Sequence, residues 1–175
     1  MRYEMREFSY DREKAVAYAH QWAYFRNPNY YDFQDIGGDC TNYASQCIFA
    51  GSGIMNYTPT FGWYYISVND RAPAWTGVQY LYNFLTTNEG VGPYGREVTI
   101  NEIQPGDVIQ LALDRDEFHH SPVVVSIVDN TPTLDNIQIA AHTNDCDCRP
   151  LSSYNFRKIR FIHIQGVRYL QAVED

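Results

Sequence analysis

The sequence has little of what a nucleic-acid-binding protein or a membrane-spanning protein needs. Its 13 Lys and Arg residues are outnumbered by 21 Asp and Glu, giving a formal net charge of -8, and they form no basic stripe. A nucleic-acid partner is therefore not expected, because nucleic-acid binding depends on clustered basic side chains.

No apolar run approaches the roughly 20 residues of a membrane span, so no membrane span is expected. The segment Met1–Glu7 lacks the apolar core of a signal peptide. A domain excised from an exported or cell-surface precursor would look the same, so the location stays open.

Cysteine is also scarce. Cys40, Cys47, Cys146 and Cys148 are too few and too unevenly spaced for the disulfide framework of a small secreted fold, so we expect free thiols. One alternative is a metal site made by His142, Cys146 and Cys148. The C-x-C pair is not the C-x-x-C spacing of common zinc sites, however, and we expect no metal and no cofactor.

The composition is that of a globular protein. Hydrophobic residues make up 45% of the 175 residues and charged residues 19%. This length suits one domain with its own core, so we expect residues 1–175 to form a single domain, and we expect a monomer.

Hydrophobic periodicity predicts helices in the first half of the chain and strands in the second. Pro28 follows the first helix, and Gly51 and Gly53 follow the second. Strands that follow one another through short turns favour an antiparallel sheet, so we expect an α+β fold with N-terminal helices packed on that sheet. The expected helices are 11–25, 40–50 and 76–85, and the expected strands are 108–113, 120–128, 136–142 and 157–167.

Cys40 is the residue most indicative of chemistry. It follows Gly37-Gly38-Asp39 and opens the second expected helix. At a helix N-terminus, unpaired amides and the positive end of the dipole lower a thiol pKa, so we expect a thiolate nucleophile. The same amides can hold an oxyanion. Cys47 lies on the inner face of the helix and reads as a small buried hydrophobic residue.

A cysteine nucleophile needs a base that later protonates the leaving amine. His119 and His120 precede the strand-forming run Pro122–Val125, and we favour His120 because it lies near the start of that strand. The base in turn needs a group that orients it. His142 on the neighbouring strand is the first candidate, with Asn144 and Asp145 as rivals.

The oxyanion hole would combine the Cys40 amide with a second donor. Gln34 lies six residues before the cysteine, and Tyr30 and Tyr31 are alternatives. Substrate contacts are expected from Asp39, beside the nucleophile, and from Trp63 and Trp75 in an aromatic segment that could wall a cleft.

Several segments together resemble a known family. They are Gly37–Gln46, Pro105–Ile109, His120–Val125 and Ala141–Thr143. In this order they are similar to the "putative amidase domain" family, which is related to the NlpC/P60 and CHAP peptidases of the papain-like superfamily. The likeness spans about residues 10 to 165, and its specific part is the Asp-Cys-Thr-Asn block at 39 to 42.

The resemblance implies a papain-like, NlpC/P60-type fold and hydrolysis of an amide or peptide bond, often in bacterial cell-wall peptides. Cys40 and His120 fall on the family's nucleophile and base, and His142 falls where NlpC/P60-type enzymes place their third polar residue. The spacing from His120 to His142 is longer than in those enzymes. Gln34 has the offset of the papain-type oxyanion glutamine, where NlpC/P60-type enzymes tend to use a tyrosine.

We therefore predict a cysteine amidase or peptidase that forms an acyl-enzyme and acts on a peptide or peptidoglycan-derived substrate. Two alternatives keep the same fold. One is a non-catalytic cell-surface binding module, and the other is a transglutaminase-like acyl transferase that uses an amine acceptor.

Overall fold

The computed structural model describes residues 1–174 as an α+β fold built on one large antiparallel sheet. The sheet has seven strands in the order β1-β9-β5-β6-β7-β8, with β4 also paired to β9, and every pairing is antiparallel. Its strands are β1 (Arg2–Phe8), β4 (Gly92–Val98), β5 (Val108–Ala112), β6 (Val123–Ile127), β7 (Ile137–Ala141), β8 (Cys146–Pro150) and β9 (Lys158–Val173). A small second sheet pairs β2 (Tyr65–Ser67) with β3 (Asp70–Arg71).

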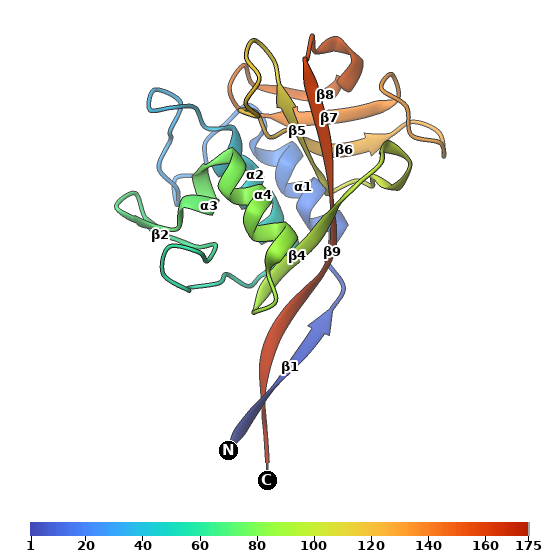
Figure 1. Cartoon of the computed structure of the whole chain (residues 1–175). Helices are drawn as coiled ribbons and strands as arrows, with labels where there is room; N and C mark the ends of the chain where they lie inside the picture. Colours follow the sequence, from blue (N-terminus) through green and yellow to red (C-terminus); the bar gives the residue numbers. More distant parts are fainter. Residues whose placement is uncertain (175) are drawn as a thin grey trace.

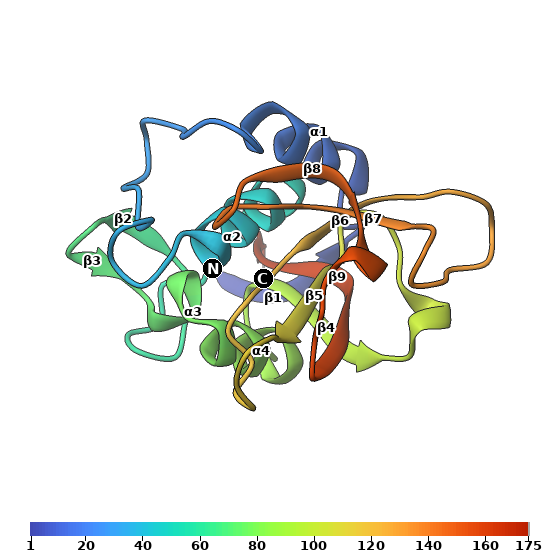
Figure 2. The same cartoon turned by 90° about the horizontal axis from the view of Figure 1, so that it is seen from above.

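The helices are gathered before the sheet in the chain. They are α1 (Arg12–Trp22), α2 (Cys40–Ser52), α3 (Pro73–Thr76) and α4 (Val78–Thr87), with the short 3-10 turns η1 (Ile100–Glu102) and η2 (Leu151–Ser153) between later strands. Helix α2 lies between α1 on one side and α3 with α4 on the other (Figures 1 and 2). No helix within residues 1–174 is long and apolar enough to cross a membrane.

Local signals set the ends of the two longest helices. The carboxylate of Asp11 accepts a hydrogen bond of 3.1 Å from the Lys14 amide, which caps α1. Gly53 ends α2 with φ of 67°, a left-handed conformation that glycine adopts without a Cβ clash. Cys40 is the first residue of α2, and the residue before it, Asp39, makes no side-chain capping hydrogen bond to the helix.

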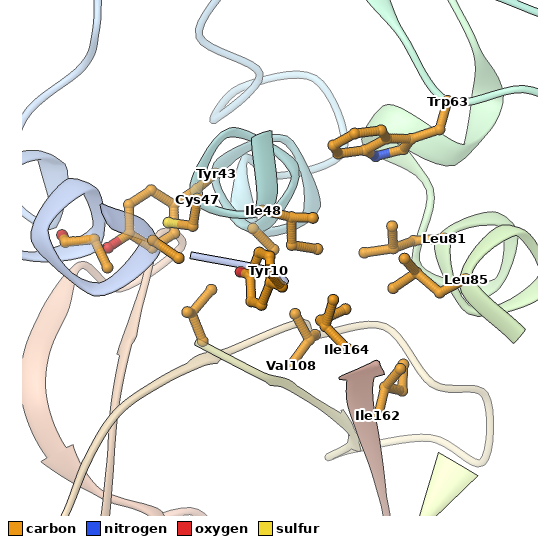
Figure 3. Close-up of a cluster of buried hydrophobic side chains, with 14 of the residues drawn as sticks. Tyr10, Tyr43, Cys47, Ile48, Trp63, Leu81, Leu85, Val108, Ile162 and Ile164 are labelled. Carbon is orange, nitrogen blue, oxygen red and sulfur yellow. The ribbon is translucent and has the colours of Figure 1, made fainter. Parts of the chain in front are cut away.

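The core lies on both faces of the sheet. On one face, α1, α2 and α4 pack against alternate residues of β5, β6, β7 and β9, as Figure 3 shows for Ile48, Leu81, Val108 and Ile162. The opposite face buries Ile109, Leu111, Val124, Ile137 and Ile139, among others, against Leu151 of η2 and the segment before β5. Because both faces are covered, β5 is buried along its whole length.

The expected α+β layout with an antiparallel sheet is confirmed, and the three expected helices correspond to α1, α2 and α4. Three strands of the large sheet were not predicted, β1, β4 and β8, and neither were β2 and β3 of the small sheet. Strand β1 is mostly exposed, so it carries no apolar alternation that a sequence pattern could register. Strand β9 runs six residues beyond the expected end at 167, where it pairs with β1 as a ribbon that leads to both ends of the chain (Figure 1).

Candidate active site

Cys40 lies with its sulfur against the backbone on both sides of His120. The Sγ atom is 3.8 Å from the carbonyl oxygen of His119, and the Ser121 backbone amide is near enough to lower the pKa of the thiol in part. Thr41 adds its own amide and its hydroxyl, the latter 3.8 Å from the sulfur. The start of α2 and the segment that leads into β6 are thus in direct contact at the thiol.

The electrostatics of this thiol differ from the sequence expectation. Cys40 is only 7% exposed. Burial raises the pKa of its thiol above the ordinary value, and the amides of Ser121 and Thr41 and the Thr41 hydroxyl offset this only in part. The structure thus differs from the expected lowering of the thiol pKa, because desolvation outweighs the effect of the helix N-terminus.

His120 is buried beside it and is also neutral. The backbone of His120 pairs with that of Leu111 in β5, and His120 lies three residues before the start of β6. Burial first, and then the charges of His119 and Arg149, lower the pKa of His120 to about 4. A neutral thiol and a neutral imidazole therefore face the same space at physiological pH.

The hydrogen-bond partner of His120 is a residue that sequence reasoning missed. The ring nitrogen Nε2 lies 3.2 Å from the hydroxyl of Tyr154, which follows η2. The same hydroxyl lies 3.8 Å from Cys146 Sγ. Burial raises the pKa of Tyr154, so its hydroxyl keeps its proton. Tyr154 is one of 15 tyrosines and sits 34 residues after His120, so nothing local in the sequence distinguishes it.

His142, expected to orient His120, makes other contacts. Its Nδ1 is 2.5 Å from the carboxylate of Asp39, and its Nε2 is 2.7 Å from the carbonyl oxygen of Trp22. Its ring stacks on Tyr43 with centroids 4.1 Å apart. Both ring nitrogens are thus engaged away from His120, and His142 joins α1 and α2 to the turn after β7.

Asp145 and Asn144, the two alternatives to His142, also have other surroundings than His120. Asp145 pairs with Arg26 through two contacts of 2.9 and 3.1 Å. Asn144 lines the cavity beside Cys40, and no contact joins its side chain to His120 within the described residues.

Asp39 is 1% exposed, so the structure corrects the expectation that it contacts substrate. Besides His142, its carboxylate accepts hydrogen bonds of 2.9 Å from the Phe33 amide and the Asn42 side chain. Gly38, before it, has φ of 97°, and a Cβ there would lie 3.2 Å from Thr143 Oγ1. The buried carboxylate and the glycine turn together fix the backbone that presents Cys40.

The two expected tryptophan contacts are corrected in the same way. Trp63 and Trp75 are fully buried. The Trp63 indole N–H donates to Ser45 at 3.0 Å, and the Trp75 indole N–H donates to Asn42 at 2.9 Å. Their rings pack together, with centroids 4.7 Å apart, and neither residue lines the cavity beside Cys40. Both tryptophans belong to the hydrophobic core and do not form the wall of a substrate cleft.

The expected second oxyanion donors do not line the cavity at Cys40. Gln34 is exposed, and its backbone N–H donates to the carboxylate of Asp32. Tyr30 stacks on Trp75, and the ring of Tyr31 meets Phe33 edge-on. Gly37, in the same loop, does line the cavity.

A cavity of about 410 Å³ opens at these residues. Cys40, His120 and Tyr154 share its wall with Gly37, Thr143, Asn144 and Leu113, and its charged or titratable lining residues are Asp114, Arg115, His119 and Arg149. The thiol, the imidazole and the phenol that contacts it therefore border one space large enough for a peptide segment.

The possible metal ligands His142, Cys146 and Cys148 do not form one site in the described part of the structure. His142 is engaged by Asp39 and Trp22, so it is not free to join Cys146 and Cys148. Within residues 1–174, His20, Asp147 and Cys148 each bring one ligand atom within 4.8 Å of the others, and His20 Nδ1 already lies 2.8 Å from Asp147. These three are the residues that could hold a cation.

Comparison with known proteins gives one family and one relative. The model of the family described as "Putative amidase domain" matches residues 9–165. The "Uncharacterized protein YhbB" of Bacillus subtilis (strain 168) is 34% identical over 124 residues, which cover 69% of this chain and 39% of that protein. The chain thus matches well under half the length of this relative. No solved structure matches.

Proposed function

We propose that this chain, which belongs to the family described as "Putative amidase domain", is a cysteine hydrolase that cleaves an amide or peptide bond. One observation carries the proposal. The Cys40 sulfur lies close to the backbone on both sides of His120, and the thiol and the imidazole line the same cavity.

The first half of the reaction begins from the neutral pair. As Cys40 Sγ attacks the amide carbonyl, His120 takes the thiol proton, and a C–S bond forms while the carbonyl π electrons move to oxygen. The Cys40 amide, the first in α2 and without a partner inside the helix, would donate to this oxyanion. The oxyanion then collapses, the C–N bond breaks, and His120 passes its proton to the leaving amine.

The second half regenerates the enzyme. A water molecule loses a proton to His120 and attacks the thioester carbonyl, and the C–S bond breaks. The proton returns to sulfur as the carboxylic acid leaves. With a pKa near 4, His120 is unprotonated at physiological pH, as a general base must be before each step.

Tyr154 takes the orienting role in this proposal. If His120 Nε2–H donates to the Tyr154 oxygen, Nδ1 carries the free lone pair that removes the thiol proton. The Tyr154 proton then points to Cys146 Sγ, which completes the chain of donors and acceptors. His142 is instead a support for the backbone before Cys40.

The finer assignments follow from the same arrangement. A nucleophile at the start of a helix packed on an antiparallel sheet that carries the base supports a papain-like, NlpC/P60-type fold, with residues 1–175 as one domain. Bacterial cell-wall peptides remain the first substrate to test, since the resemblance of the Asp39–Asn42 block points there.

The test is digestion of purified peptidoglycan, with the released fragments measured by mass spectrometry. The wild-type protein should release new amine and carboxyl ends, and Cys40→Ser should release none. Cys148→Ser is the matched control, because Cys148 is an exposed thiol outside the cavity, and it should retain activity. A labelled primary amine in the same reaction separates transfer from hydrolysis, since incorporation of label would favour the acyl transferase. Absence of new ends with wild-type protein, where a known amidase releases them, would remove the cell-wall assignment.

A further inference from the structure

Most arginines of the described chain pair with a carboxylate, but the two arginines that line the cavity do not. Within residues 1–174, seven arginines lie within 4.0 Å of a carboxylate oxygen, as expected in a chain of net charge -8: Arg2, Arg6, Arg12, Arg26, Arg96, Arg157 and Arg168. Four have no such partner in that part of the chain, and two of these, Arg115 and Arg149, line the cavity at Cys40. Unpaired guanidinium groups are thus concentrated where a substrate would enter.

Arg149 is held in place by neutral groups. Its Nε donates to the Ser153 hydroxyl at 2.7 Å, and one terminal nitrogen reaches the Ser153 carbonyl at 3.3 Å. The guanidinium carbon lies 3.6 Å from the centroid of the Tyr154 ring. None of these contacts uses Nη1, and the charge is close enough to help lower the pKa of His120. Arg149 is therefore a pre-positioned cation beside the proposed base.

Arg115 is the second cation. It lies in the loop between β5 and His120 and makes no hydrogen bond or ion pair in the described part of the chain. The one carboxylate that lines the cavity, Asp114, is 3.2 Å from His119 Nε2. The lining thus has an excess of positive charge in an acidic protein.

We propose that this site, if it is the hydrolase site proposed above, takes amide substrates that carry a carboxylate close to the bond cleaved. Guanidinium groups bind carboxylates through paired, charge-assisted hydrogen bonds, and such pairs are stronger in a partly enclosed cavity than in open solvent. Arg149, fixed on Tyr154, would hold the carboxylate, and Arg115 would attract it at the entrance.

The test needs no knowledge of the substrate, because alkylating reagents of different charge probe the same cavity. Iodoacetate is anionic and iodoacetamide is its neutral analogue. Each rate at Cys40 is followed by peptide mass spectrometry, and the ratio of the two is compared with that of a neutral cysteine peptide. The ratio for Cys40 should be at least about tenfold higher and should fall as salt is raised, because salt screens the attraction.

Variants assign the effect to the two arginines. Arg149→Gln and Arg115→Gln should each lower the ratio by about threefold, and Arg149→Lys should retain most of it because the charge remains. Arg96→Gln removes the same charge from an exposed ion pair on β4 and should leave the ratio unchanged. An unchanged ratio in both cavity variants, or a wild-type ratio equal to that of the peptide, would overturn the proposal.

Protection of Cys40 from iodoacetamide locates the carboxylate. N-acetylglutamate amide offers a side-chain carboxylate, N-acetylglutamine a terminal one, and N-acetylglutamine amide none. Stronger protection by either acid supports the proposal and names the source, whereas equal protection by all three contradicts it. If Cys40 reacts with neither reagent at any pH while Cys148 reacts with both, the proposed hydrolase itself fails, which is a different outcome.

Discussion

At the scale of single residues, burial decides the protonation of the candidate nucleophile and base. A cysteine at a helix N-terminus favours a thiolate, but Cys40 is almost fully desolvated, and the pKa of its thiol is raised. His120 shifts in the opposite direction because burial disfavours its charged form. Proton transfer therefore accompanies attack in the proposed reaction and does not precede it.

The first prediction concerns the pH dependence of Cys40 alkylation. If the thiol stays protonated, the iodoacetamide rate at Cys40 should rise about tenfold per pH unit from pH 7 to pH 8.5 without a plateau. The rate is measured by mass spectrometry of the Cys40 peptide. A plateau that begins below pH 7 would instead indicate a thiolate–imidazolium pair.

The second prediction concerns stability and His120. Its pKa is about 4 in the folded protein, against an ordinary value of 6.5. The unfolded chain therefore binds a proton more readily, so the stability is fully present above pH 6.5 and is lost as the pH falls toward 4. This loss amounts to ~3 kcal/mol. Urea unfolding should show that His120→Gln loses less stability than wild type between pH 7 and pH 4 by about this amount, and parallel curves would contradict it.

The third prediction tests Tyr154 as a positioning residue. Tyr154→Phe removes only the hydroxyl that contacts His120. We expect kcat for amide hydrolysis to fall by about tenfold or more with KM little changed, since ring orientation and not binding is lost. The unfolding free energy should change by only ~1 kcal/mol. A loss of stability with normal kcat would make Tyr154 a structural residue.

At the scale of elements, the site depends on how helix α2 is joined to the turn between β7 and β8. Asp39, just before α2, and His142, just after β7, form the buried pair that makes this connection. Trp22 at the end of α1 accepts from the same imidazole. Three elements distant in the sequence thereby fix the backbone on which Cys40 is placed.

The fourth prediction follows from this connection. His142→Ala leaves the Asp39 carboxylate buried without its imidazole partner and should lower the unfolding free energy by about 3 kcal/mol or more. His20→Ala removes an exposed imidazole from its contact with Asp147 and should cost no more than ~1 kcal/mol. Chemical denaturation of both variants measures the difference. Equal small losses would argue against a structural role for His142.

At the scale of the whole molecule, a compact body carries a two-stranded ribbon. Strand β1 and the end of β9 pair beyond the rest of the sheet, toward both ends of the chain (Figure 1). Tyr3, Met5 and Leu170 on this ribbon are exposed. A ribbon of two strands without a covered face is of marginal stability.

The fifth prediction is that the ribbon opens without the body. Backbone amides of residues 170–173 should exchange with solvent at least ~10²-fold faster than those of residues 159–164, which pair with β5, with β4 or with both. Hydrogen exchange followed by mass spectrometry resolves the two segments. Equal protection would indicate that a second copy or another partner covers the ribbon.

Patterns local in the chain predicted much of the architecture. Apolar periodicity predicted α1, α2 and α4, and short runs of strand-forming apolar residues predicted the central strands, which are largely buried. Strands β1, β4 and β8 lack that signal: β1 is mostly exposed, β4 contains Pro93 and Gly95, and β8 is largely polar. Their pairing depends on partners far along the chain, which a local pattern does not contain.

The sequence by itself determined which thiol and which imidazole to consider, since a glycine turn before Cys40 and a strand-forming run after His120 are written in neighbouring residues. Only the tertiary structure decided their surroundings. It buried Trp63 and Trp75, bound His142 to Asp39 and brought Tyr154 to His120. The physical reason is that desolvation and hydrogen bonding depend on which distant segments pack together.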